Sequence, residues 1–159
     1  MSTLARSRLD GPALEAWRGY LRSHATILRE LDAELLATHG LTTRDYEVLL
    51  LIGQAPDRRL AMSALAESTM LTRSGITRLV DGLVSSGLIE RVSCPGDARV
   101  CHAKLTPAGL RKLRQAGEVH AAGIERLFLS HFDDHEQTVL AELLGRLPGA
   151  RADAACTVD

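Results

Sequence analysis

The sequence predicts a mainly helical α+β fold that contains a single β-hairpin. Leu and Ala supply much of the apolar content, while aromatic residues make up only 3% of the 159 residues, and this balance favours packed helices over a β-sandwich. Apolar residues recur every three or four positions along most of the chain, the spacing of one helix face. Residues 88–105 instead have the pattern of two strands joined by a turn. A chain of this length is expected to form one domain.

The first long helix is expected over residues 12–38. Its apolar positions are separated alternately by three and four residues, a heptad pattern that marks one packing seam. Gly40 ends this helix, and Thr42 with Asp45 provides the capping box of the next one, which closes near Gly53. The seam consists of Leu14, Trp17, Leu21, His24, Leu28, Leu31 and Leu35.

A short helix over residues 62–68 and a second helix that starts after Thr72 have the spacing of a helix-turn-helix. Thr72 is an N-cap residue, and Gly87 suits the left-handed position that follows a helix. One side of the second helix is apolar. The other side carries groups that can bond to bases or phosphates in the major groove of DNA. These are Arg73, Ser74, Thr77, Arg78 and Asp81.

The hairpin is a candidate wing beside this helix. Its strands are expected at residues 88–94 and 99–105, and the four residues between them, Pro95 to Ala98, have the composition of a turn. Arg99 would then reach the adjacent minor groove or its phosphates, where a narrow groove concentrates negative potential.

Two more helices are expected after the hairpin. Thr106 followed by Pro107 is a strong helix start, because Pro is well suited to the first helical position. That helix is expected to continue to about Ser130. The last helix is expected from Asp133 to Leu147.

The distribution of charge agrees with an anion-binding middle section. The whole chain has a net charge of −1. Residues 58–114, however, contain ten Arg or Lys and four acidic residues, whereas both flanking segments are acidic. A basic section of this kind suits nucleic acid.

The sequence favours a cytoplasmic protein. No apolar run reaches the ~18 residues of a membrane span, and the first twenty residues lack the apolar core of a signal peptide. A membrane partner is therefore not expected. The three cysteines, Cys94, Cys101 and Cys156, have no disulfide-framework spacing, so their thiols are expected to be reduced.

The wing segment resembles the MarR family of transcriptional regulators. Asp97-Ala98-Arg99, followed after five intervening residues by Leu105-Thr106, is similar to the family's D-x-R and L-T signature, and Gly109 extends the match. Residues 71–80 resemble the family's recognition helix, and residues 85–91 resemble its exit into the wing. The similarity covers roughly residues 12–147.

The resemblance implies a winged helix-turn-helix regulator, most often a repressor, that binds a pseudo-palindromic operator in double-stranded DNA as a homodimer. It implies dimerisation helices in residues 1–40 and 107–148, a DNA-binding region in residues 41–106, and a disordered tail over residues 149–159. In the family the wing Asp and Arg form a salt bridge, and Asp97 and Arg99 match them. The DNA-binding residues expected here are Thr72, Arg73, Ser74, Thr77, Arg78, Arg91, Asp97 and Arg99.

The resemblance also implies a cleft for a small lipophilic effector. Trp17, Tyr20, His24 and Tyr46 are expected near it, although aromatic residues at helical spacing are also typical of a core. An alternative is a zinc-responsive regulator of the same fold. Glu47 and His120 fall near the ligand positions of zinc-sensing relatives, but Ala116 stands where that pattern has another histidine.

Three further alternatives have weaker support. Cys94 and Cys101 flank the wing turn and could act as a thiol sensor. A winged helix could bind protein instead of DNA, although the basic middle section argues against this. An enzyme is not expected, because the chain lacks a phosphate-binding Gly loop, a nucleophile elbow and an H-E-x-x-H pair.

Overall fold

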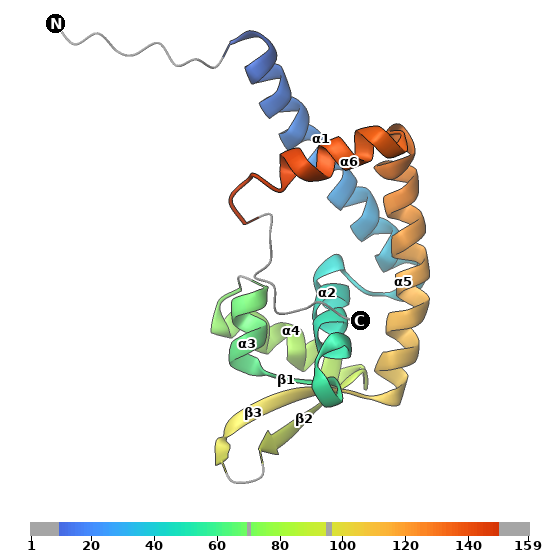
Figure 1. Ribbon diagram of the computed structural model, residues 1–159. Coiled ribbons are helices and arrows are strands. Elements are labelled where there is room, and N and C mark those ends of the chain that lie inside the picture. Colours follow the sequence, from blue (N-terminus) through green and yellow to red (C-terminus); the bar gives the residue numbers. More distant parts are fainter. Residues whose placement is uncertain (1–9, 70, 95–96, 150–159) are drawn as a thin grey trace, which may run out of the picture.

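The protein is described by a computed structural model that covers residues 10–69, 71–94 and 97–149, with the backbone alone at residues 94 and 97–100. Helices dominate this part of the chain, and three short strands form one antiparallel sheet (Figure 1). The elements are α1 (Gly11–His39), α2 (Thr43–Gln54), the 3-10 turn η1 (Pro56–Arg58), β1 (Arg59–Ala61), α3 (Met62–Ser68), α4 (Arg73–Ser85), β2 (Ile89–Cys94), β3 (Asp97–Leu105), α5 (Pro107–Leu127), the 3-10 turn η2 (Leu129–His131) and α6 (Asp134–Leu144).

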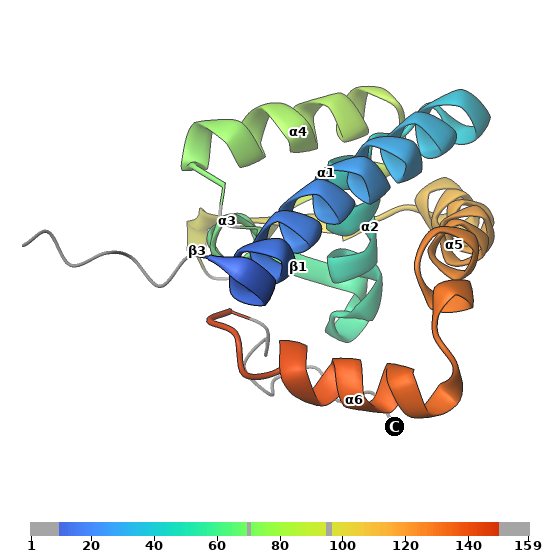
Figure 2. The same cartoon turned by 90° about the horizontal axis from the view of Figure 1, so that it is seen from above.

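The elements gather at two ends of the molecule. Most of α1, all of α6 and the C-terminal part of α5 form one end, and α2, α3, α4 and the sheet form the other (Figure 1). Helix α5 runs between the two ends and packs along α1. Seen from above, α1 crosses the molecule between α4 and α6 (Figure 2). The arrangement confirms the predicted mainly helical α+β fold with a winged helix-turn-helix.

The hydrophobic core lies at the end that contains the sheet. Leu35 from α1, Leu49 and Ile52 from α2, Leu65 from α3 and Val80 from α4 are all fully buried in one cluster. Each side chain of this size contributes about 1.5–3 kcal/mol on burial. The core therefore fixes α4 against the rest of the domain.

Hydrogen bonds at the start of α2 fasten this helix to α1. The predicted capping box is present, with the Thr42 hydroxyl accepting from the Asp45 amide at 3.1 Å. Asp32 of α1 adds a second cap, because its Oδ1 accepts from both the amide and the hydroxyl of Thr43 at 2.8 Å. The two helices are therefore joined at a fixed angle.

The sheet contains one strand that the sequence analysis did not predict. β1 pairs with β3, so the strand order is β1-β3-β2. With three residues, β1 is too short to show an alternating pattern. Strand β3 begins at Asp97, two residues before the predicted start, and the ladder has a register shift between Ser93 and Cys94.

The predicted end of α5 was wrong by three residues, and that of α6 was also too late. Helix α5 ends at Leu127, because Phe128 leaves the helical conformation with φ −132° and ψ −64°. The Phe128 ring then packs edge-on against Phe132, with centroids 5.5 Å apart. Helix α6 starts where predicted, with Asp133 and Glu136 forming a capping box, but ends at Leu144.

Candidate nucleic-acid interface and ligand sites

Helix α4 has the capping that the sequence predicts at both ends. The Thr72 hydroxyl accepts from the Gly75 amide at 3.1 Å. At the other end Gly87 has φ +71°, and the amides of Gly87 and Leu88 bond to the carbonyls of Val84 and Leu83. This double closure is a Schellman motif, in which Gly avoids the strain of a left-handed residue. The chain therefore turns sharply from α4 into β2.

The two sides of α4 differ in burial as predicted. Ile76, Val80 and Leu83 are buried in the core. On the opposite side, the side chains of Arg73 and Arg78 are exposed, and among the described residues neither has an acidic partner within 4.0 Å. Both guanidinium groups are therefore available to phosphates or to guanine, which arginine binds in bidentate fashion.

The hydroxyl groups on α4 are already engaged in local bonds. Thr77 donates to the Arg73 carbonyl at 2.7 Å, as Ser and Thr side chains often do inside helices. The hydroxyls of Thr72 and Ser74 lie 3.2 Å apart. These groups lie on the exposed side of α4 with the arginines, but they have less bonding capacity left for DNA.

The turn between α3 and α4 is held by a buried threonine. Thr69 is 2% exposed, and its hydroxyl donates to the Leu65 carbonyl at 2.7 Å. Arg44 of α2 reaches the Thr69 carbonyl at 3.5 Å. These bonds fix the start of the turn to α3 and α2.

Arg91 is bonded to α4. Its Nη2 donates to Asp81 Oδ1 at 2.7 Å, and its Nη1 lies 3.8 Å from the Sγ of Cys101 on β3. The ion pair links α4 to β2, and the contact with Cys101 extends the link to β3. Arg91 therefore lies in the predicted interface but has an acidic partner, unlike Arg73 and Arg78.

Thr106 is the junction of α4, the wing and α5. Its hydroxyl is 2.7 Å from the Gly87 carbonyl and accepts from the Gly109 amide at 2.9 Å, while its amide donates to the Leu88 carbonyl at 3.1 Å. A Cβ on Gly109 would stand 2.0 Å from that same Leu88 oxygen. The Leu105-Thr106 and Gly109 motif thus has a physical reason: it closes the base of the wing.

For the predicted wing pair, Asp97 and Arg99, the structure describes the backbone and not the side chains. Their expected salt bridge stays a prediction. The predicted thiol pair also stays a prediction. Cys101 has a partly buried free thiol, but only the backbone of Cys94 is described.

The four residues predicted for an effector cleft fall in two places. Trp17, Tyr20 and His24 form a stacked row along α1, with ring centroids 6.0 and 5.9 Å apart. Tyr20 and His24 line an apolar hollow of about 540 Å³ between α1, α6 and the Phe128–Phe132 pair. Tyr46 is elsewhere, packed on His120 of α5 with centroids 4.7 Å apart.

The two predicted zinc ligands are not part of a metal site within the described residues. Glu47 bonds to Arg44 at 3.0 Å. His120 faces Tyr46, its Nδ1 is buried without a hydrogen-bond partner in the described part of the chain, and burial lowers its pKa. No three His, Cys, Asp or Glu side chains in that part are grouped so as to hold a metal ion. The arrangement gives the zinc alternative no support.

The residues that brace the predicted interface could not be identified from the sequence. Asp81 was expected on the solvent side, but its bond to Arg91 depends on how the hairpin folds back, which no local pattern encodes. Asp32 and Thr106 were missed for a similar reason. Asp32 bonds to a residue 11 positions away, and Thr106 bonds to carbonyls 18 and 19 positions away.

In the described ranges no helix is long and apolar enough to cross a membrane.

These features define a class of protein. A packed helix-turn-helix with exposed arginines on its second helix, followed by a hairpin braced against that helix, is the architecture of winged helix-turn-helix DNA-binding regulators. Residues 39–100 match the model of the MarR family. By this match and its relatives, the chain belongs to the MarR family of transcriptional regulators.

Two regulators illustrate the sequence relationship. The chain is 30% identical over 121 residues to the HTH-type transcriptional regulator PecS of Dickeya dadantii, covering 75% of this chain and 71% of PecS. It is 31% identical over 111 residues to the HTH-type transcriptional repressor YetL of Bacillus subtilis, covering 70% of this chain and 66% of YetL, slightly under two thirds. The relatives are regulators, which confirms the expectation that this chain is not an enzyme.

Solved structures agree with the family. AbsC, a MarR family regulator from Streptomyces coelicolor, is similar with a TM-score of 0.80 and 29% identity, covering 86% of this chain and 91% of AbsC. Sco3205 from the same organism, solved in complex with DNA, has a TM-score of 0.81 and 27% identity, covering 89% of each chain.

Proposed function

We propose that the protein is a homodimeric repressor that binds a pseudo-palindromic operator in duplex DNA and is modulated by a small ligand. The observation that carries the proposal is the exposed side of α4. Arg73 and Arg78 lie there without acidic partners in the described structure, on a helix whose opposite side is locked into the core. A rigid helix with free arginines suits the major groove.

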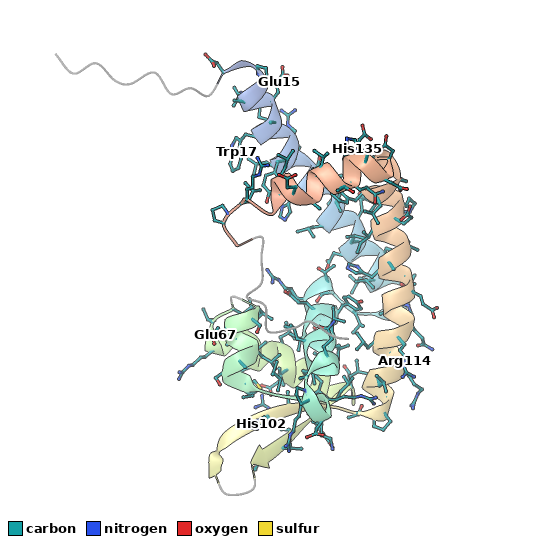
Figure 3. All side chains as sticks on the ribbon, in the orientation of Figure 1. Glu15, Trp17, Glu67, His102, Arg114 and His135 are labelled. Carbon is teal, nitrogen blue, oxygen red and sulfur yellow. The ribbon has the colours of Figure 1, made fainter. Side chains whose placement is uncertain are left out.

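The apolar surface of α1 and α6 supports the dimer. The seam of α1 is buried only in its C-terminal half, where Leu31 and Leu35 are at most 4% exposed. In the other half Trp17 is 51% exposed, and on α6 Leu143 is 48% exposed. Figure 3 shows Trp17 at the end of the molecule away from the strands. Large apolar side chains left open on neighbouring helices are typical of an interface, and a second copy would cover them.

The similarity to the repressor YetL supports repression, and the similarity to Sco3205, solved in complex with DNA, supports binding to an operator. The hollow lined by Tyr20 and His24 supports a lipophilic effector, because an apolar cavity with few polar groups is typical of small-molecule sites. Tyr46 is separate from this hollow, so the proposed site omits it. A DNA-binding repressor would act in the cytoplasm.

Fluorescence anisotropy tests the proposal. The purified protein is titrated onto labelled DNA from beside its own gene and onto scrambled DNA, at several salt concentrations. A repressor of this kind binds the first DNA more tightly, and log K falls steeply with log salt because phosphate contacts release counterions. Equal binding to both DNAs contradicts sequence-specific recognition, and weak binding without salt dependence favours a protein partner.

A further inference from the structure

A second hollow lies at the base of the wing, on the side of the sheet away from α4. It has a volume of about 720 Å³ and lies between the η1 turn, β3 and the start of α5. Its charged lining consists of Asp57, Arg58, Glu90, Lys104 and Arg111. None of these residues belongs to the predicted DNA or effector sites.

The register of the sheet places two of these charges, Glu90 and Lys104, in one row with Arg59, which is not part of the lining. Arg59 of β1 and Glu90 of β2 are both cross-strand partners of Lys104 on β3, and directly paired residues share one face of a sheet. Arg91 follows Glu90 and therefore points to the opposite face, where it bonds to Asp81 of α4. The row thus lies away from the face that α4 and Arg91 occupy.

Positive charge exceeds negative charge around this hollow. Lys104 Nζ is 3.4 Å from Glu90 Oε1, and Arg59 Nη2 is 3.6 Å from Asp57 Oδ2. Arg58 and Arg111 have no acidic partner within 4.0 Å in the described residues. Both acids are thus already shared with other cations, and two guanidinium groups remain unneutralised.

The η1 turn holds Arg58 at the rim in an unusual conformation. Asp57 and Arg58 have φ values of +54° and +51°, a left-handed region that residues with a Cβ rarely adopt. Two such residues in succession persist only where the surrounding structure fixes them. Here β1 pairs directly after the turn, so the backbone of Arg58 is held beside the sheet.

We propose that this hollow is a binding site for a small doubly charged oxyanion, carrying phosphate or carboxylate groups, with Arg58, Lys104 and Arg111 as its ligands. Planar guanidinium groups bind both kinds of oxyanion in bidentate fashion. Because Lys104 also bonds to Glu90, an anion that engages Lys104 competes with the pair that joins β2 to β3. The site therefore regulates operator binding through the wing, a consequence that rests on the proposed function.

Calorimetric titration of the full chain with inorganic phosphate, and separately with malonate, tests the site. Ionic strength is held constant with chloride, and the variants are Arg111→Gln and Arg58→Asn, since Asn tolerates the left-handed conformation. The control is Arg114→Gln, which removes an exposed charge from α5 outside the hollow. Each arginine contributes charge-assisted bonds, so we expect each variant to bind at least about tenfold more weakly and the control to bind like the wild type.

The same proteins are then titrated onto operator DNA with and without the anion. Binding of phosphate or malonate that depends on Arg58 and Arg111, together with a changed operator affinity, supports the proposal, and the stronger anion identifies the ligand chemistry. No saturable binding of either anion, or equal loss in Arg114→Gln, overturns it. Weaker operator binding by Arg111→Gln without any anion also overturns it, because the hollow would then contact DNA. Failure of the wild type to bind operator contradicts the proposed function instead.

Discussion

Arg78 and Asp81 lie three positions apart on the exposed side of α4 but have different roles. Arg78 has no acidic partner in the described residues, so its charge is available to DNA. Asp81 bonds to Arg91 at 2.7 Å and holds a strand of the wing. At the scale of single residues, we propose that Arg78 reads DNA, whereas Asp81 positions the strand beside it.

Replacing Arg78 with Ala should reduce discrimination between operator and random DNA. A bidentate arginine–guanine contact contributes about 1–3 kcal/mol, so specificity should fall about tenfold or more. Anisotropy titrations on both DNAs measure this ratio, with Arg114→Gln as the control. If only the salt dependence changes, Arg78 contacts a phosphate and the prediction fails.

Replacing Asp81 with Asn should weaken operator binding while leaving stability nearly unchanged. The pair is partly exposed, and exposed ion pairs contribute about 0–1 kcal/mol. The loss of operator affinity in Asp81→Asn should come from a change in the position of the wing. A double-mutant cycle with Arg91→Gln on operator affinity checks this, because coupled residues give non-additive losses. Additive losses would mean that Arg91 acts on DNA independently of Asp81.

His120 should make stability depend on pH. Burial lowers its pKa in the folded protein. As the pH falls below about 6.5, His120 therefore binds a proton in the unfolded chain before it does so in the folded protein. The stability that neutral His120 contributes is present above that pH and is lost as the pH falls toward the lowered value. Urea unfolding at pH 7 and pH 5 should show a smaller loss for His120→Gln than for the wild type. The exposed His135→Gln is the control, and equal losses in all three proteins would refute the prediction.

At the scale of elements, the base of the wing is fixed by bonds to the neighbouring helices. Thr106 bonds to the end of α4 and to the start of α5, and Gly109 allows α5 to approach the Leu88 carbonyl. The angle between recognition helix, wing and α5 therefore depends on a few backbone contacts.

Replacing Gly109 with Ala should destabilise the protein. The new Cβ would stand 2.0 Å from a backbone oxygen, and relieving such a clash costs about 1–3 kcal/mol or more. Gly82→Ala on α4 is the matched control, since its Cβ meets nothing within 4 Å. Because Ala favours helices over Gly by about 0.5–1 kcal/mol, that variant should be stabilised. Chemical denaturation measures both, and a stable Gly109→Ala would contradict the account of the wing base.

The predictability of each element from the sequence follows from how local its determinants are. Helix starts at Thr42, Thr72 and Thr106 were predicted because caps act within three residues. β1 was missed because it pairs with β3, a strand far away in the sequence. The early end of α5 was missed although the Phe128–Phe132 contact beside it is local, because apolar periodicity alone does not show where the backbone leaves the helix. The exposed side of α4 could be predicted from periodicity, whereas its brace through Asp81 and Arg91 could not.

At the scale of the whole molecule, one end has a closed core and the other exposes large apolar side chains. The core around α2 and α4 is closed, whereas Trp17, Leu21 and Leu143 are open to solvent at the opposite end. The two ends are connected by α5, which packs on both α1 and α2. Assembly at the open end would therefore determine the spacing of two α4 helices.

Replacing both Trp17 and Leu143 with Glu should produce a monomer that binds operator poorly. Charges in an apolar interface are strongly unfavourable, and a lone chain can contact one half-site only. Light scattering should give about twice 17.2 kDa for the wild type and 17.2 kDa for the variant. Arg114→Glu, distant from these side chains along α5, should remain dimeric. A wild-type chain that is monomeric on its own and on DNA would refute the assembly.

Hydroxyl-radical footprinting on the operator tests the central claim most directly. Two α4 helices in successive major grooves predict two protected half-sites about one helical turn, ~10 bp, apart, and protection that weakens in both half-sites when Arg78 is replaced. A single protected segment, or a footprint that does not depend on Arg78, would contradict recognition by a symmetric pair of α4 helices.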